Sequence, residues 1–293
     1  MGQRLDNFLA RECRGVPRSR VYRMIRRGEV RINGSRAQPS RRLSLGDVVR
    51  IPPVSSDSDI NWQPSQELKE KARECIAYRE AGLLVVDKPP GWAVHRGSGL
   101  RFGLIDLLQE LDGGMECSLV HRLDRDTSGC LLVATNPSMV RTLGAWFRER
   151  KVEKRYDALV CGRWPHGIDR LSIPLRKLHI GVREHRVVGG ESGDDAVTLA
   201  RICRSSDRIT WMRFRTETGR THQIRVHAQT IGHPVVGDPK YGDDARLPKP
   251  PRMMLHAKSV RLPDGREYEV RAGSEFRDYW NKVVTMPESL DQL

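Results

Sequence analysis

Residues 121–129 read His121-Arg122-Leu123-Asp124-Arg125-Asp126-Thr127-Ser128-Gly129 and form the most distinctive stretch of this 293-residue chain. The apolar run Cys130-Leu131-Leu132-Val133-Ala134 follows at once. This pattern predicts a polar, turn-rich loop that leads into a buried strand. Loops of this kind often carry catalytic groups, because the strand fixes them while one side stays open. An Asp flanked by Arg side chains stays ionised, which suits a nucleophile or a base better than an acid.

The same loop has two competing interpretations. A segment with this many charges is commonly a solvent-exposed turn, whose surface ion pairs contribute little stability. Asp124-x-Asp126 is also similar to the Asp-x-Asp-x-Thr loop of aspartyl-phosphate phosphatases. Against that similarity, Thr127 falls one place early, and the apolar strand follows the Asp instead of preceding it. A phosphatase would further require a metal and release phosphate.

HRLDRDTSG as a whole resembles the signature loop of the RNA pseudouridine synthases of the RluA type. In that family the Asp of HRLD is the catalytic residue, so the resemblance implies this role for Asp124. A uridine must leave the base stack to reach a buried carboxylate. Arg122, next to Asp124, is therefore a candidate to fill the space that the uridine vacates.

Two later motifs extend the resemblance. FRERKVEKRYDALV (147–160) matches the second family motif, whose Tyr lies against the target base; this implies stacking and proton transfer for Tyr156. GRTHQIRVH (219–227) matches the third motif. There the last Arg pairs with the catalytic Asp, so Arg225 is the expected partner of Asp124. The residue before it, Ile224, is expected to line the pocket, and His222 to contact the substrate.

The three motifs together favour catalysis over a non-catalytic RNA-binding ribosome assembly factor, which remains the alternative. No cofactor is expected, because the isomerisation needs no redox, phosphoryl or metal step. His222 and His227 fall on a predicted strand, where a five-residue spacing directs them to opposite faces and disfavours joint metal ligation.

The charge of the chain indicates a polyanionic partner. The formal net charge is +14, and residues 1–52 alone hold 13 Arg, 4 acidic residues and no Lys. Arg suits bidentate contacts with phosphate and stacking on bases. Such contacts give affinity and salt dependence without reading sequence.

The N-terminal segment predicts two helices and two strands. Leu5, Phe8 and Leu9 have helical spacing, and a second helix is expected over 18–27, ending at Gly28. Glu29-Val30-Arg31-Ile32 is expected to form a strand, Asn33-Gly34 indicates a tight hairpin turn, and a last strand is expected over 48–51. SRVYRMIRRGEVRING resembles the small RNA-binding domain first seen in a small-subunit ribosomal protein. The resemblance implies phosphate contacts by Arg20, Arg23, Arg26, Arg27 and Arg31.

We therefore expect an α+β protein with three parts: a small helix-helix-hairpin RNA-binding domain (1–53), a linker (54–72) and a pseudouridine synthase catalytic domain (73–293). The family fold implied for the last part is a mixed, largely antiparallel sheet with flanking helices and a central cleft. Residues 163–195 are expected to form loops and irregular strands.

The implied activity is isomerisation of specific uridines in large-subunit (23S) ribosomal RNA, with Asp124 as the nucleophile on a flipped-out uridine. The expected partner is this RNA or its assembly intermediates, bound by a monomer and not by a membrane. The six Cys are scattered without a C-x-x-C pair, and the N-terminus lacks an apolar signal region. These features predict a reduced, cytoplasmic location.

Overall fold

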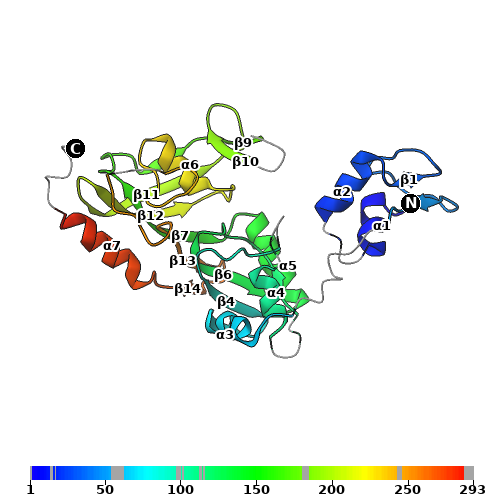
Figure 1. Ribbon diagram of the computed structural model, residues 1–293, viewed down its shortest axis with the longest axis horizontal. Helices are drawn as coiled ribbons and strands as arrows, with labels where there is room; N and C mark the ends of the chain where they lie inside the picture. The colour runs from blue at the N-terminus through cyan, green and yellow to red at the C-terminus, as the bar shows by residue number, and fades with distance from the viewer. Residues whose placement is uncertain are drawn as a thin grey trace. The chain divides into compact units, whose positions relative to one another are not determined.

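The computed structural model describes residues 2–13, 16, 18–53, 63–96, 100, 102–111, 114, 116–179, 185–242 and 246–286. The chain divides into two compact units, Met1–Gln63 and Pro64–Leu293 (Figure 1). Within the described ranges, no helix is both long enough and apolar enough to cross a membrane.

The first unit contains the elements that the sequence predicts. They are α1 (Leu5–Glu12), α2 (Arg18–Arg27), β1 (Arg31–Ile32) and β2 (Val49–Arg50). Asn33 and Gly34 have positive φ angles of 51° and 79°, which confirms the tight turn. The strand that pairs with β1, however, is the distant β2.

Helix α2 has two distinct faces. Val21, Met24 and Ile25 are buried in a core shared with Leu5 and Leu9 of α1. The opposite face exposes the side chains of Arg23, Arg26 and Arg27. This division follows the helical repeat of apolar and basic residues, so the core of the unit leaves the basic face open.

The second unit is built on a ten-stranded sheet. Among the pairings that the structure describes, only β6 with β13 is parallel. β5 (Ser118–Leu119) pairs with β6, and β14 (Glu267–Glu269) pairs with β13. The other strands follow in the spatial order β3 (Ile76–Glu80), β4 (Leu83–Lys88), β6 (Ser128–Ala134), β13 (Leu255–Arg261), β7 (Glu153–Cys161), β12 (Ile209–Thr216), β11 (Val197–Ser205), β8 (Arg170–Ser172).

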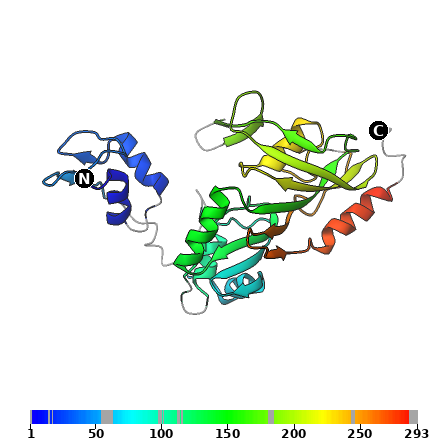
Figure 2. The same ribbon diagram turned by 180° about the vertical axis from the view of Figure 1, so that it is seen from behind.

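Helices cover both halves of this sheet. α4 (Leu104–Gln109) and α5 (Pro137–Arg148) pack on opposite faces of β4 and β6. α6 (Gln223–Thr230) packs with Phe214 of β12, and α7 (Ser274–Val284), red in Figures 1 and 2, packs on the other face of the same half. Tyr156 on β7 contacts the α4 core and the α6 core alike. The two halves therefore meet at Tyr156.

Three features differ from the sequence-based expectation. Residues 223–230 form helix α6, not a strand; every residue from Gln223 to Ala228 is buried, which hides the helical repeat. The expected linker over 54–72 is shorter, because α3 (Gln66–Glu74) belongs to the second unit; residues 54–62 lie outside the described ranges. Within 163–195, β9 (Leu175–His179) and β10 (His185–Gly189) form a regular antiparallel hairpin.

The parallel contact between β6 and β13 depends on Gly129. Its φ is +104°, and a Cβ at this position would lie 2.3 Å from the carbonyl oxygen of Ala257. The main chains of the two strands thus approach where His256 pairs with Ser128 and Ala257 with Gly129. A glycine is required here because it has no side chain and tolerates this φ.

We expect Gly129→Ala to lower the free energy of unfolding by more than the roughly 1–3 kcal/mol that a strained φ alone costs. Gly265→Ala is the matched control, because Gly265 has φ +92° but no described atom would lie within 4 Å of a Cβ added there. Urea unfolding of both variants measures the difference. Equal losses would contradict the role of the close approach.

Candidate active site

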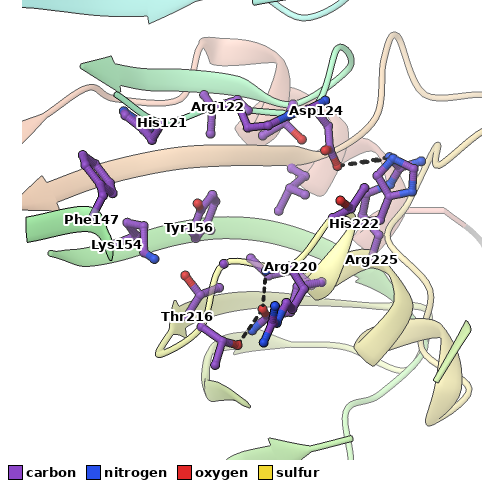
Figure 3. A pocket seen from close by; sticks show the side chains of 18 of the residues that line it. His121, Arg122, Asp124, Phe147, Lys154, Tyr156, Thr216, Arg220, His222 and Arg225 are labelled. Carbon is purple, nitrogen blue, oxygen red and sulfur yellow. Dashed lines mark hydrogen bonds and ion pairs between the residues drawn. The ribbon is translucent and has the colours of Figure 1, made fainter. Parts of the chain in front are cut away.

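A cavity of about 380 Å³ opens beside Asp124 (Figure 3). The polar loop, β7, the end of α5 and the turn before α6 surround it. Six Arg or Lys side chains and one carboxylate, that of Asp124, are among the lining residues, so the cavity suits an anionic substrate. The lining comprises residues 120–124, Thr127, Phe147, Arg148, Arg150, Lys154, Tyr156, Thr216, 218–225 and Leu255.

Asp124 is held by Arg225, as the family resemblance implies. Nη1 of Arg225 donates to Oδ2 of Asp124 at 3.2 Å. The rest of the guanidinium forms a two-pronged contact with Asp238: Nε and Nη2 each donate to one of its carboxylate oxygens at 2.7 Å. Asp238 is fully buried, whereas the side chain of Asp124 is 18% exposed and faces the cavity. Arg225 thus joins a hidden carboxylate to an accessible one.

Tyr241 holds the other side of Arg225. The guanidinium carbon lies 5.0 Å from the centre of the Tyr241 ring. The Tyr241 hydroxyl accepts from the backbone N–H of Val187 and lies 2.7 Å from Nδ1 of His222. Nε2 of His222 is 3.9 Å from Asp124. Burial lowers the pKa of His222, so at neutral pH this is a contact between a neutral imidazole and a carboxylate.

Two side chains anchor the loop that carries Asp124. Nε2 of His121 accepts a hydrogen bond from the backbone N–H of Leu132 at 2.7 Å, and its ring stacks on Phe147. Nζ of Lys88 donates to three carbonyl oxygens at 2.8–2.9 Å, one of which belongs to Arg125. Burial lowers the pKa of Lys88 to about 7. The three carbonyls favour the charged form, because a neutral amine would turn its lone pair toward one of them.

Tyr156 and Lys154 lie two residues apart on β7, so both side chains project from the same face of the strand toward the cavity. Burial and the charge of Asp124 raise the pKa of Tyr156 and keep it a phenol. The loop side contributes Arg122, which is exposed, and α6 contributes the buried Ile224. The structure therefore brings all six expected residues of this site to one cavity.

The second carboxylate of the loop is directed elsewhere. Asp126 pairs with its neighbour Arg125 at 3.1 Å and does not line the cavity. Asp124 and Asp126 therefore do not converge on one site, as the two carboxylates of a phosphatase would need to. Across the described part of the chain, no three or more His, Cys, Asp or Glu side chains gather closely enough to hold a metal ion.

Two known protein families match the sequence of this chain. Residues 82–230 match the RNA pseudouridylate synthase family, and residues 3–49 match the S4 domain. The chain belongs to the RNA pseudouridylate synthase family, whose members are isomerases that act on RNA.

Relatives and solved structures place the chain within this family. The protein named ribosomal large subunit pseudouridine synthase C from Vibrio vulnificus is 43% identical over 89% of this chain and 85% of its own length. The protein of the same name from Salmonella typhimurium is 42% identical over the same shares. The structure of human RNA pseudouridylate synthase domain containing 1 is 28% identical, with a TM-score of 0.59, and covers 74% of this chain and 94% of its own.

Sequence reasoning missed the residues that hold the site in place. Asp238 and Tyr241 stand in the stretch HPVVGDPKYG, which resembles a family loop near the site but gives no sign of what these two side chains do. The sequence does not indicate the roles of Lys88 and His121 either. A Lys before two prolines and a His beside an apolar strand are common, so only the hydrogen bonds reveal their roles.

We expect His121 to make stability depend on pH. Burial, aided by the charge of Lys154, lowers the pKa of His121 to about 3, whereas an unfolded His titrates near 6.5. The folded state therefore loses stability as pH falls from about 6.5 toward 3, by roughly 2 kcal/mol between pH 7 and 5. His121→Gln keeps an acceptor for Leu132 without this titration. Denaturant unfolding at both pH values should show a smaller loss for the variant; identical losses would contradict the assignment.

Proposed function

We propose that this enzyme converts specific uridines of large-subunit ribosomal RNA to pseudouridine, with Asp124 as the nucleophile. The observation that carries the proposal is the ion pair of Asp124 with Arg225 inside a cavity that also contains Tyr156. The name of the relatives supports large-subunit ribosomal RNA as the substrate. The six cationic side chains of the cavity suit a phosphate backbone.

The reaction requires three events at the uridine. The bond between N1 and C1′ breaks, the base turns, and C5 forms a new bond to C1′ while C5 loses its proton. Asp124, oriented by Arg225, can attack C1′ or C6, or assist elimination. Asp124 is only partly exposed. The uridine must therefore leave the stack, at a cost of roughly a few kcal/mol unless it is unpaired. Single-stranded loops are accordingly the favoured targets.

Tyr156 has a more limited role in this proposal than Asp124. Its flat ring at the cavity wall suits stacking on the uracil. Its raised pKa disfavours a phenolate that would take the C5 proton. Arg122, exposed at the rim, is placed to fill the gap that the uridine leaves in the RNA.

The S4 domain supplies affinity for RNA in this proposal. Arg23, Arg26 and Arg27 are exposed on α2, and Arg20 and Arg31 are half-buried beside them. These side chains would contact phosphates, which bring RNA to the enzyme without choosing the uridine. The cavity would make that choice.

We expect Asp124→Asn to abolish the release of tritium from C5-labelled uridine in protein-free large-subunit RNA. Asn keeps the shape of the side chain but is not a nucleophile, so single-turnover release should fall by at least ~10³-fold. Asp126→Asn is the control, since Asp126 lies outside the cavity, and should retain activity. Equal release by wild type and Asp124→Asn would show that Asp124 is misassigned. Binding without release by wild type, on free RNA and on assembling particles, would favour a non-catalytic assembly factor.

We expect the double variant Arg23→Gln, Arg27→Gln to weaken RNA binding and its salt dependence. Each phosphate contact that is removed should reduce the slope of log K against log salt by about 0.7–0.9, so the double variant should reduce it by about 1.4–1.8. Filter binding between about 50 and 200 mM salt measures the slope. Arg163→Gln, which removes an exposed ion pair with Asp207, should leave it unchanged. An unchanged slope for the double variant would exclude these two phosphate contacts.

A further inference from the structure

Lys154 is a half-buried cation that pairs with no carboxylate among the described residues. It lines the cavity from β7, and burial and the charge of Arg150 lower its pKa. Within the same described ranges, Nζ of Lys154 forms no hydrogen bond. An ideal Cβ on Gly219 would lie 3.9 Å from Nζ, so the amine lies over the turn at the cavity wall.

Arg122, Arg148 and Arg150 at the cavity are exposed to solvent, whereas the other, less exposed cations around the site are paired. Arg225 is bound to two carboxylates, and Lys88 donates to three carbonyl oxygens. Arg220 donates to Asp194 and to a backbone carbonyl. Burying an ammonium without compensation is unfavourable, so Lys154 lowers the stability of the free enzyme. A group kept at such a cost beside a reaction site indicates an anionic ligand.

The proposed reaction supplies such an anion, and this inference rests on that proposed function. If Asp124 attacks C1′, or assists elimination, the electron pair of the N1–C1′ bond passes to the uracil and is shared by N1, O2 and O4. If an oxygen of Asp124 instead bonds to C6, the π pair of the C5–C6 double bond moves toward C4 and leaves an enolate on O4. Every route therefore places negative charge on the uracil ring before C5 bonds to C1′.

The position of Lys154 fits the far edge of that ring. In Figure 3, Lys154 lies beyond Tyr156 as seen from Asp124. Side chains two residues apart on a strand are separated by about 6.5–7 Å, which is close to the width of a uracil with its carbonyl oxygens. A uracil stacked on Tyr156 with its sugar at Asp124 would direct a carbonyl oxygen toward Nζ.

We propose that the Lys154 ammonium binds a carbonyl oxygen of the target uracil and stabilises the negative charge that develops there when the glycosidic bond or the C5–C6 double bond gives up its electrons. The contact gains strength as the charge grows, so it acts on the rate more than on binding. The rival ligand for the same ammonium is a phosphate of the RNA backbone, which is charged before and after reaction and would contribute to affinity alone.

The test compares wild type, Lys154→Met, Lys154→Arg and Lys151→Met by single-turnover tritium release at saturating RNA, with the Kd of the RNA measured in parallel. Lys151→Met is the matched control, because Lys151 is exposed and pairs with Glu149 at 2.8 Å. We expect Lys154→Met to lower the rate roughly 100-fold with Kd changed less than about threefold, as for the loss of one oxyanion donor. Lys154→Arg should recover part of the rate, and Lys151→Met should match wild type.

Thermal unfolding separates this role from a structural one. Met has a similar length and no charge, so Lys154→Met should unfold at the same temperature as wild type or a higher one. A lower Tm accompanied by the rate loss would assign Lys154 to the fold and overturn the proposal.

Two further outcomes would also overturn it. A full rate at saturation with a raised Kd and a reduced salt slope would identify a backbone phosphate as the ligand. An unchanged rate and Kd would remove Lys154 from the reaction. Failure of the proposed function is distinct from all of these, because wild type itself would then release no tritium.

Discussion

The geometry of the site depends on the ion pairs that Arg225 forms with Asp238 and Asp124. Asp238 binds Nε and Nη2 and also accepts the backbone N–H groups of Lys240 and Tyr241, so its carboxylate is fully engaged. Only Nη1 is left to meet Asp124. A buried ion pair adds little net stability after desolvation, but breaking one is strongly destabilising. The benefit of this arrangement is therefore precision: the guanidinium is fixed before a substrate arrives, and so is the accessible carboxylate.

The sheet order makes this meeting possible. Asp124 and Arg225 are separated by 101 positions in sequence. β13, which is late in sequence, inserts between β6 and β7, and its parallel contact with β6 brings the start of β6 against the half of the sheet that carries β7 and α6. Because Gly129 lies at that contact and ends the loop that carries Asp124, the close approach of the two main chains also sets where the loop emerges. Lys88 and His121 then fasten the loop to the turn after β4 and to β6 itself.

Local patterns in the sequence predict the helices and strands that expose one face to solvent. These patterns fail to predict an element that is buried on all sides. The sequence predicts the basic and apolar faces of α2 and the apolar run that becomes β6, because residue type follows burial in both elements. α6 is buried throughout, and its Ile224, Val226 and Ala228 mimic a strand. The Asp124–Arg225 pair could be expected only through family resemblance, since a contact over 101 positions leaves no local signal. Asp238 was missed for a similar reason: an acidic residue in a loop is ordinarily exposed, and only its four hydrogen bonds explain its burial.

In the proposed reaction, the charges of Asp124 and Lys154 both face the bound base, but they differ in how the protein balances them. The charge of Asp124 is balanced by Arg225 before substrate enters, so the carboxylate is held at a fixed place. The charge of Lys154 is balanced by nothing within the described residues. A neutral uracil gives that ammonium only a modest partner, so little of the attraction is realised on binding. The attraction grows as electrons move into the ring, and only interactions that are stronger in the transition state than in the bound substrate accelerate a reaction. In the proposed reaction, only the substrate pairs with Lys154, whereas the protein itself pairs with Asp124, the proposed nucleophile. This arrangement favours the transition state over the substrate.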